Sequence, residues 1–80
     1  MQIKILPFGI TKEILGSPAL HFATEELLTA ASLKKSLFEQ YPALKALNSL
    51  AIAVNGAYAE DDLPIQAGDE VVLIPPVSGG

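Results

Sequence analysis

The chain of 80 residues has no cysteine, no arginine, no tryptophan and a single histidine, His21. The lack of cysteine excludes disulfides, a thiolate nucleophile, a cysteine-ligated zinc ion and an iron–sulfur cluster. One histidine gives little material for a catalytic triad or a His-rich metal site. It alternates with Leu20 and Phe22 as on a half-exposed strand, so we expect its side chain to face solvent. No metal site is predicted.

Positive charge is also scarce, with five lysines against nine acidic residues and a net charge of −4. Because phosphate contacts require clustered lysine and arginine, nucleic-acid binding is disfavoured. No segment approaches eighteen consecutive apolar residues, so we expect no membrane span. A strand-like pattern begins at Met1 and leaves no room for a signal peptide, which predicts a cytoplasmic protein.

Apolar residues are abundant: half of the chain is hydrophobic, and the mean hydropathy is +0.39. A domain of this size has a high surface-to-volume ratio and leaves many residues exposed. We therefore expect an exposed apolar patch, which typically marks a partner interface. The length allows one domain, placed at residues 1–76, with an extended tail over residues 77–80.

The pattern along the chain predicts one main helix among several strands. Thr29 is expected to cap a helix that ends near Gln40, and Pro7 is expected to weaken pairing at the end of the first strand. This order predicts an α+β protein of the β-grasp (ubiquitin-like) architecture: a mixed sheet of four to five strands around one helix, with the first and last strands parallel in the middle. The predicted strands are 2–8, 19–28, 50–55, 57–59 and 71–74, with a helical turn at 11–15, an irregular or short helical segment at 43–49, a tight turn at 55–56, a solvated acidic turn at 60–62, a linker at 63–67 and a turn at 68–69.

The sequence ends on Pro75-Pro76-Val77-Ser78-Gly79-Gly80. The two prolines stop the last strand and favour a stiff, extended conformation. The two glycines add no stability to a folded domain, because glycine loses the most backbone entropy on ordering, and we expect a flexible tail. A chain without Cβ atoms can, however, thread a narrow channel and present its carboxylate there. A frayed terminus is the alternative interpretation.

Four motifs stand out along the chain: Phe8-Gly9 with Lys12-Glu13, Ala53-Val54-Asn55-Gly56, Gly68-Asp69-Glu70-Val71 and the terminal six residues. Together they resemble the small, sulfur-carrying subunit family of molybdopterin synthase. The Gly-Gly end is shared by all ubiquitin-like carriers, whereas Pro-Pro-Val-Ser-Gly-Gly is specific to this subfamily. The chain departs from the family at Pro7, where an aromatic or aliphatic residue is frequent, and at Lys12, where arginine is common.

The resemblance implies a chemistry for the terminal carboxylate. A partner activating enzyme adenylates it with ATP, and sulfur then displaces AMP to leave a thiocarboxylate. The tail enters the large, catalytic subunit of a heterotetrameric synthase and donates sulfur to cyclic pyranopterin monophosphate. The resulting dithiolene later holds molybdenum or tungsten. The carrier itself binds no cofactor and supplies no catalytic acid or base.

The resemblance also assigns roles to residues. Gly80 is the adenylate and thiocarboxylate acceptor, and Gly79 permits threading. Phe8, Tyr58 and Ile74 fall at positions of the apolar interface with the large subunit, where ordinary core packing is the alternative. Pro75, Pro76, Val77 and Ser78 are expected to contact the partner as well.

Three other functions stay open on the sequence alone. The chain could carry sulfur for thiamine synthesis or tRNA thiolation, and the large partner that co-purifies would tell these apart. It could be a ubiquitin-like modifier joined to lysines of other proteins. It could also be a structural interaction domain with an inert tail.

Overall fold

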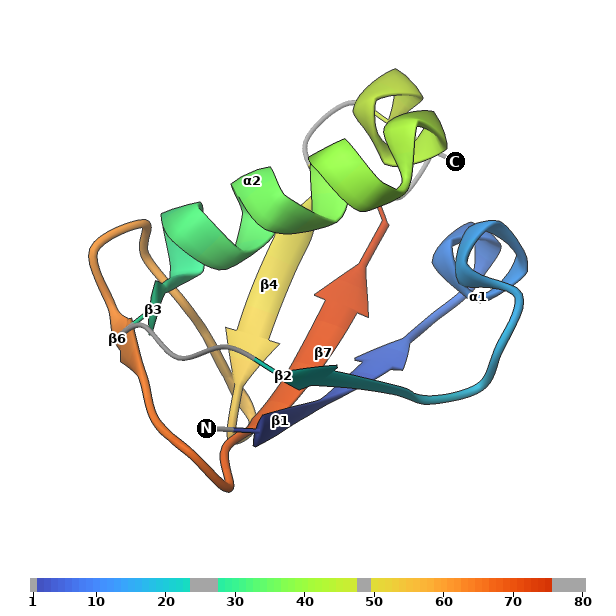
Figure 1. Ribbon diagram of the computed structural model, residues 1–80. Helices are drawn as coiled ribbons and strands as arrows, with labels where there is room; N and C mark the ends of the chain where they lie inside the picture. The colour runs from blue at the N-terminus through green and yellow to red at the C-terminus, as the bar shows by residue number, and fades with distance from the viewer. Residues whose placement is uncertain (1, 24–27, 48–49, 76–80) are drawn as a thin grey trace.

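A computed structural model describes residues 2–23, 28–47 and 50–75 (Figure 1). The predicted tail at 77–80, its flexibility and the boundary at residue 76 lie outside these residues. The strands are β1 (Gln2–Pro7), β2 (Leu20–Ala23), β3 (Leu28–Thr29), β4 (Ala51–Val54), β5 (Ala57–Tyr58), β6 (Pro64–Ile65) and β7 (Glu70–Ile74), and the helices are α1 (Ile10–Leu15), α2 (Ala30–Gln40) and the 3₁₀ helix η1 (Pro42–Ala46).

Five strands form one mixed sheet in the order β2-β1-β7-β4-β5. The central pair, β1 and β7, is parallel, and the other neighbours are antiparallel. The predicted mixed sheet with parallel first and last strands is therefore confirmed. β3 and β6 form a separate two-stranded sheet.

The second predicted strand, 19–28, has its two ends in different sheets, as β2 and β3, and the predicted linker at 63–67 is partly a strand. Among the described residues, β2 pairs with β1 from Ile5 opposite Leu20 to Gln2 opposite Ala23. Leu28 pairs instead with Ile65, which is buried in the core. Two-residue strands such as β6 are too short to show a period, so the sequence pattern could not separate β6 from a loop.

Pro7 does not weaken pairing with β7, contrary to the prediction. It stays in register with Leu73, and the next residue, Phe8, donates its backbone N–H to the carbonyl of Leu73 at 3.1 Å. Successive N–H groups of a strand point to opposite sides, so the donor that proline lacks would face β2. Pairing on that side already ends at Ile5 and Leu20, so proline costs the sheet no ladder bond there.

Helix α2 crosses one face of the sheet and covers the core (Figure 1). Its N-cap is Thr29, as predicted, whose hydroxyl accepts from the backbone N–H of Ser32 at 3.2 Å. The helix ends at Gln40, because Tyr41 precedes a proline and is disfavoured in the α region. No helix among the described residues is long and apolar enough to cross a membrane. The fully buried side chains of the core include Ile3, Ile5, Leu33, Leu37, Leu44, Ile65, Val71 and Leu73.

Two loops at the start of β7 are joined by an amide–carboxylate clamp. Asn55 has φ 51° and Gly56 has φ 88°, so the turn after β4 is the tight turn that the sequence predicts. The Asn55 amide donates to Asp69 Oδ1 at 3.0 Å, and its carbonyl oxygen accepts from the N–H of Glu70 at 3.0 Å. Asp69 Oδ2 accepts from the N–H of Gln66 at 2.8 Å. Two of the motifs that carry the family resemblance therefore hold the fold together.

Candidate partner-binding face

The sheet has one face toward α2 and one face away from it, and we call the second the outer face. Along β1, Ile3, Ile5 and Pro7 are buried on the α2 side, whereas Lys4 and Leu6 alternate with them. This alternation follows from the period of two in a strand. The outer face is therefore made by every second residue of each strand.

The outer face divides into a polar half and an apolar half. Strand register sets His21, Lys4 and Glu70 side by side in one polar row. The next two rows toward the end of β7 are apolar. The first runs through Leu6, Val72, Ala53 and Tyr58, and the second contains Ile74 and Ala51. Phe8 directly follows β1 and donates its N–H to the carbonyl of Leu73, the residue before Ile74, so it adjoins the second row. We call these seven residues the apolar patch.

Two of the three predicted interface residues are plainly exposed. Phe8 is 56% exposed and Tyr58 is 75% exposed. Core packing, the alternative interpretation, is therefore wrong for both. Ile74 is half-buried and lies between them, on the strand next to Phe8. His21 faces solvent, as predicted.

Val72, Ala51 and Ala53 were not predicted to be part of this surface. The signal was present in β4, because a period of two that puts Ile52 and Val54 on the inner face puts Ala51 and Ala53 on the outer face. Ala53 is only 7% exposed yet does not belong to the main core cluster. Its register partners Val72 and Tyr58 lie on either side of it. The small alanine side chain therefore forms a shallow depression in the apolar patch between two larger side chains.

The apolar patch lies at the end of the sheet where the tail begins. β7 starts in the polar half with Glu70 and ends in the apolar half with Ile74, which Pro75 follows directly. Pro75 is half-buried. Pro76, Val77, Ser78, Gly79 and Gly80 lie outside the described residues, so their predicted roles stay predictions.

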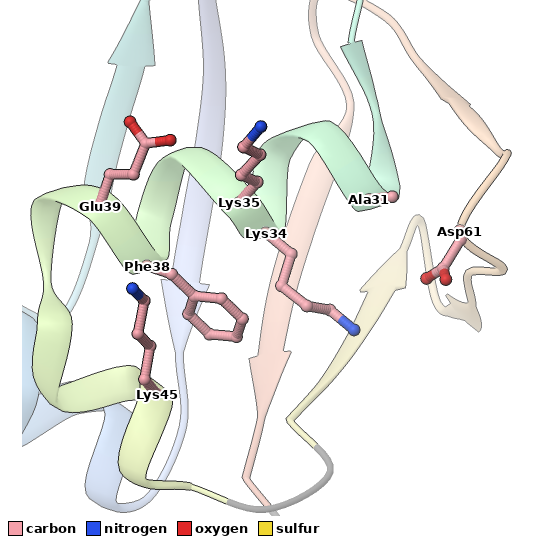
Figure 2. Close-up of a pocket in the computed structure, with 7 residues that line it drawn as sticks. All are labelled: Ala31, Lys34, Lys35, Phe38, Glu39, Lys45 and Asp61. Atoms are coloured by element: carbon pink, nitrogen blue, oxygen red, sulfur yellow. The ribbon is translucent and has the colours of Figure 1, made fainter.

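A separate hollow of about 300 Å³ lies on the α2 side of the molecule (Figure 2). Figure 2 shows the ring of Phe38 between the side chains of Lys34 and Lys45, while Lys35 and Glu39 point away from the ring. Asp61 lies at one end. Charges of both signs line this hollow, and the sheet separates it from the apolar patch. It therefore offers sites for control substitutions that leave the outer face intact.

Residues 5–80, which include almost all of the described fold, match the model of the ThiS family. The chain belongs to the ThiS family. Curated relatives support this: the molybdopterin synthase sulfur carrier subunit of Arabidopsis thaliana is 32% identical over 81 residues, covering 100% of this chain and 84% of that protein. Its counterpart from Dictyostelium discoideum is 35% identical over 83 residues, covering 99% and 96%.

Solved structures of similar proteins share the fold of this ThiS-family chain. SAMP1, a small archaeal modifier protein of Haloferax volcanii, superposes with a TM-score of 0.81 at 26% identity and full coverage of both chains. A chain in the complex of subunits 1 and 2 of the molybdopterin-converting factor from Helicobacter pylori superposes with a TM-score of 0.70, at 26% identity and full coverage. The fold is the ubiquitin-like β-grasp, and the family inferred from the sequence motifs is confirmed.

Proposed function

We propose that this chain is the sulfur carrier subunit of a molybdopterin synthase. One observation carries the proposal: the apolar patch lies at the end of the sheet where the Gly-Gly tail begins. A partner that covers the patch therefore receives the tail at the same place. Relatives named as molybdopterin synthase sulfur carrier subunits at 32% and 35% identity support the choice of pathway.

The proposed chemistry takes place on the carboxylate of Gly80. A carboxylate oxygen attacks the α-phosphorus of ATP in the activating enzyme, and pyrophosphate leaves. Hydrosulfide, as the sulfur nucleophile, then attacks the acyl carbon, the bond to AMP breaks with AMP as the leaving group, and loss of the proton on sulfur leaves the thiocarboxylate. A persulfide donor would also need a thiol to reduce its S–S bond. AMP is a better leaving group than oxide, which is why activation precedes sulfur entry. A cysteine-free carrier can hold sulfur in this way on an acyl group.

The proposed acceptor of the loaded tail is the large synthase subunit, which binds the apolar patch. Phe8 and Ile74 lie at the centre of this contact and Tyr58 at its edge. The solved complex of subunits 1 and 2 from Helicobacter pylori supports a partner of this kind. There the thiocarboxylate gives sulfur to cyclic pyranopterin monophosphate. A cytoplasmic location stays a prediction.

A chain extension tests the carrier function. Adding one alanine after Gly80 leaves the described fold untouched but removes the glycine carboxylate from the end of the chain. Loaded with sulfur by its activating enzyme and mixed with the large subunit, the natural chain is expected to form product and the extended chain none. Product from the extended chain, with mass analysis showing the added alanine still present, would rule out Gly80 as the sulfur donor.

A ubiquitin-like modifier is the second candidate function, favoured by the similarity to SAMP1. In that function the activated carboxylate of Gly80 acylates a lysine amine of another protein. Cells expressing a tagged chain would then contain larger covalent adducts with branched Gly-Gly peptides after digestion. Their absence, together with thiocarboxylate on the free chain, supports the carrier function alone.

A further inference from the structure

Gly9, which follows Phe8, has a backbone conformation that is unfavourable for every residue with a Cβ atom. Its φ of 57° and ψ of −134° mirror the extended conformation of ordinary residues. Glycine reaches this region readily, whereas any Cβ atom meets steric strain there. Asparagine tolerates the left-handed helical region, as Asn55 does here, but this region of the map is different. The position therefore requires glycine on conformational grounds alone.

Gly9 also lies against the residue from which the tail departs. A Cβ atom at Gly9 would stand 3.2 Å from Cγ of Pro75. Carbon atoms in favourable contact lie about 3.5–4.0 Å apart, so this site has no room for a methyl group unless the proline ring moves. Gly16, Gly56 and Gly68 also have positive φ, but a Cβ atom there would meet nothing within 4 Å. Among the described glycines, Gly9 alone combines positive φ with a close neighbour.

Hydrogen bonds hold the Gly9 side of this contact to β7 and to the first turn of α1. The N–H of Phe8 donates to the Leu73 carbonyl at 3.1 Å, which ties the segment to β7 two residues before Pro75. The fully buried Thr11 donates its hydroxyl and, at 3.1 Å, its N–H to the Phe8 carbonyl. The N–H of Lys12 donates to the Gly9 carbonyl at 3.0 Å. The backbone at Gly9 is therefore held in place, and the φ angle of Pro75 is fixed by its ring.

We propose that Gly9 is a positioning residue for sulfur transfer: its bare Cα seats the ring of Pro75 and so sets the direction in which the chain leaves the domain. The inference rests on the proposed carrier function. Five residues follow Pro75, and fully extended they reach at most about 17 Å. Where the tail is held extended in a narrow channel, a turn of about 20° at its base would displace its end by about 6 Å. Reacting atoms misplaced by about 1 Å can already lose about a hundredfold in rate.

A double-mutant cycle with Gly9→Ala and Pro75→Ala tests this contact. Alanine at position 75 lacks the Cγ atom that a methyl group at position 9 would strike. Gly16→Ala is the control for adding a methyl group in open space at positive φ. Because Gly16 lies in the left-handed helical region, it does not reproduce the backbone strain at position 9, which the cycle separates instead. For each full-length protein, loaded as thiocarboxylate, the single-turnover rate is measured at saturating large subunit, together with the half-saturating concentration and the melting temperature.

We expect Gly9→Ala to lower the saturated rate by about tenfold or more, in line with the cost of misplaced reacting groups, while Gly16→Ala stays within about twofold of the natural chain. Pro75→Ala alone lowers the rate severalfold, because the ring no longer seats on Gly9. In the Pro75→Ala background, adding Gly9→Ala has little further effect. Backbone strain at position 9 persists in the double variant, so this non-additivity isolates the contact from the strain.

Three results would overturn the inference. The first is an equal fractional loss from Gly9→Ala in both backgrounds, and the second is a loss no larger than that of Gly16→Ala. The third is an unchanged rate for Pro75→Ala. This result is decisive even if Gly9→Ala does not fold, because Pro75 lies beyond β7 and outside the core. Failure of the natural chain itself to transfer sulfur would instead contradict the proposed function, so the two failures are distinguishable.

Discussion

Phe8→Asp tests the apolar patch, because the structure separates its effect on binding from its effect on folding. The side chain is 56% exposed, and its neighbours on β1 hold the inner face without it. For a side chain of roughly 200 Å², about 110 Å² is available for burial in a complex. At ~25 cal/mol per Å², docking of Phe8 contributes up to about 2.8 kcal/mol.

Ordering of the side chain lowers that figure, while forcing a carboxylate into an apolar contact adds to the loss. We therefore expect the affinity of Phe8→Asp for the large subunit to fall by about tenfold to a hundredfold. Isothermal titration calorimetry measures this, and thermal unfolding of the free chain is expected to change little. Lys45→Gln is the matched control, because it makes the same change of net charge beside the hollow on the α2 side.

Two outcomes would refute the reasoning. If Phe8→Asp unfolds the free domain, the residue belongs to the core and the faces of the sheet are assigned wrongly. If the variant folds and binds the large subunit as tightly as Lys45→Gln does, the apolar patch is not the docking surface, even where the tail still transfers sulfur.

Substitutions at three further sites test how the fold is held. Asn55→Ala removes the amide–carboxylate clamp and places alanine, which lacks a polar side chain, at φ 51°. We expect urea unfolding to show a free energy of unfolding lower by about 1–3 kcal/mol, while the rate of sulfur transfer stays unchanged. Leu33→Ala leaves a cavity at a fully buried site beneath α2 and is expected to lower the free energy of unfolding by about 2–5 kcal/mol. A smaller decrease would mean that neighbouring core side chains move in to fill the cavity. Thr29→Ala removes the helix cap at a cost of about 0.5–2 kcal/mol, and Thr29→Ser, which keeps the hydroxyl, is expected to retain most of the stability.

Much of the fold follows from local patterns in the sequence. The cap at Thr29 and the proline after Tyr41 bound α2, and Asn55-Gly56 specifies a tight turn. The regular alternation in β1 gives its buried face. Long-range pairing carried no such signal: β3 and β6 meet across more than thirty residues of sequence and are too short to show a period.

The candidate site was predictable in part, for a similar reason. Phe8 and Tyr58 were assigned through the resemblance to a family, and their exposure could be inferred from strand alternation. The shallow depression in the apolar patch depends on register between β7 and β4, which sets Ala53 beside Val72 and cannot be derived from either strand alone. The contact between Gly9 and Pro75 joins residues far apart in sequence, so only the folded chain displays it.

The central claim is that the carboxylate of Gly80 carries sulfur, and intact mass spectrometry tests it most directly. The chain is expressed together with its activating enzyme and a sulfur source, purified without reductant or acid, and weighed beside the variant that carries one extra alanine. The account predicts that the natural chain gains the mass difference between one sulfur and one oxygen atom, located by fragmentation at Gly80, and that the extended variant gains none. An unchanged mass of the natural chain under conditions where the activating enzyme consumes ATP, or a gain of sulfur in both proteins, would contradict it.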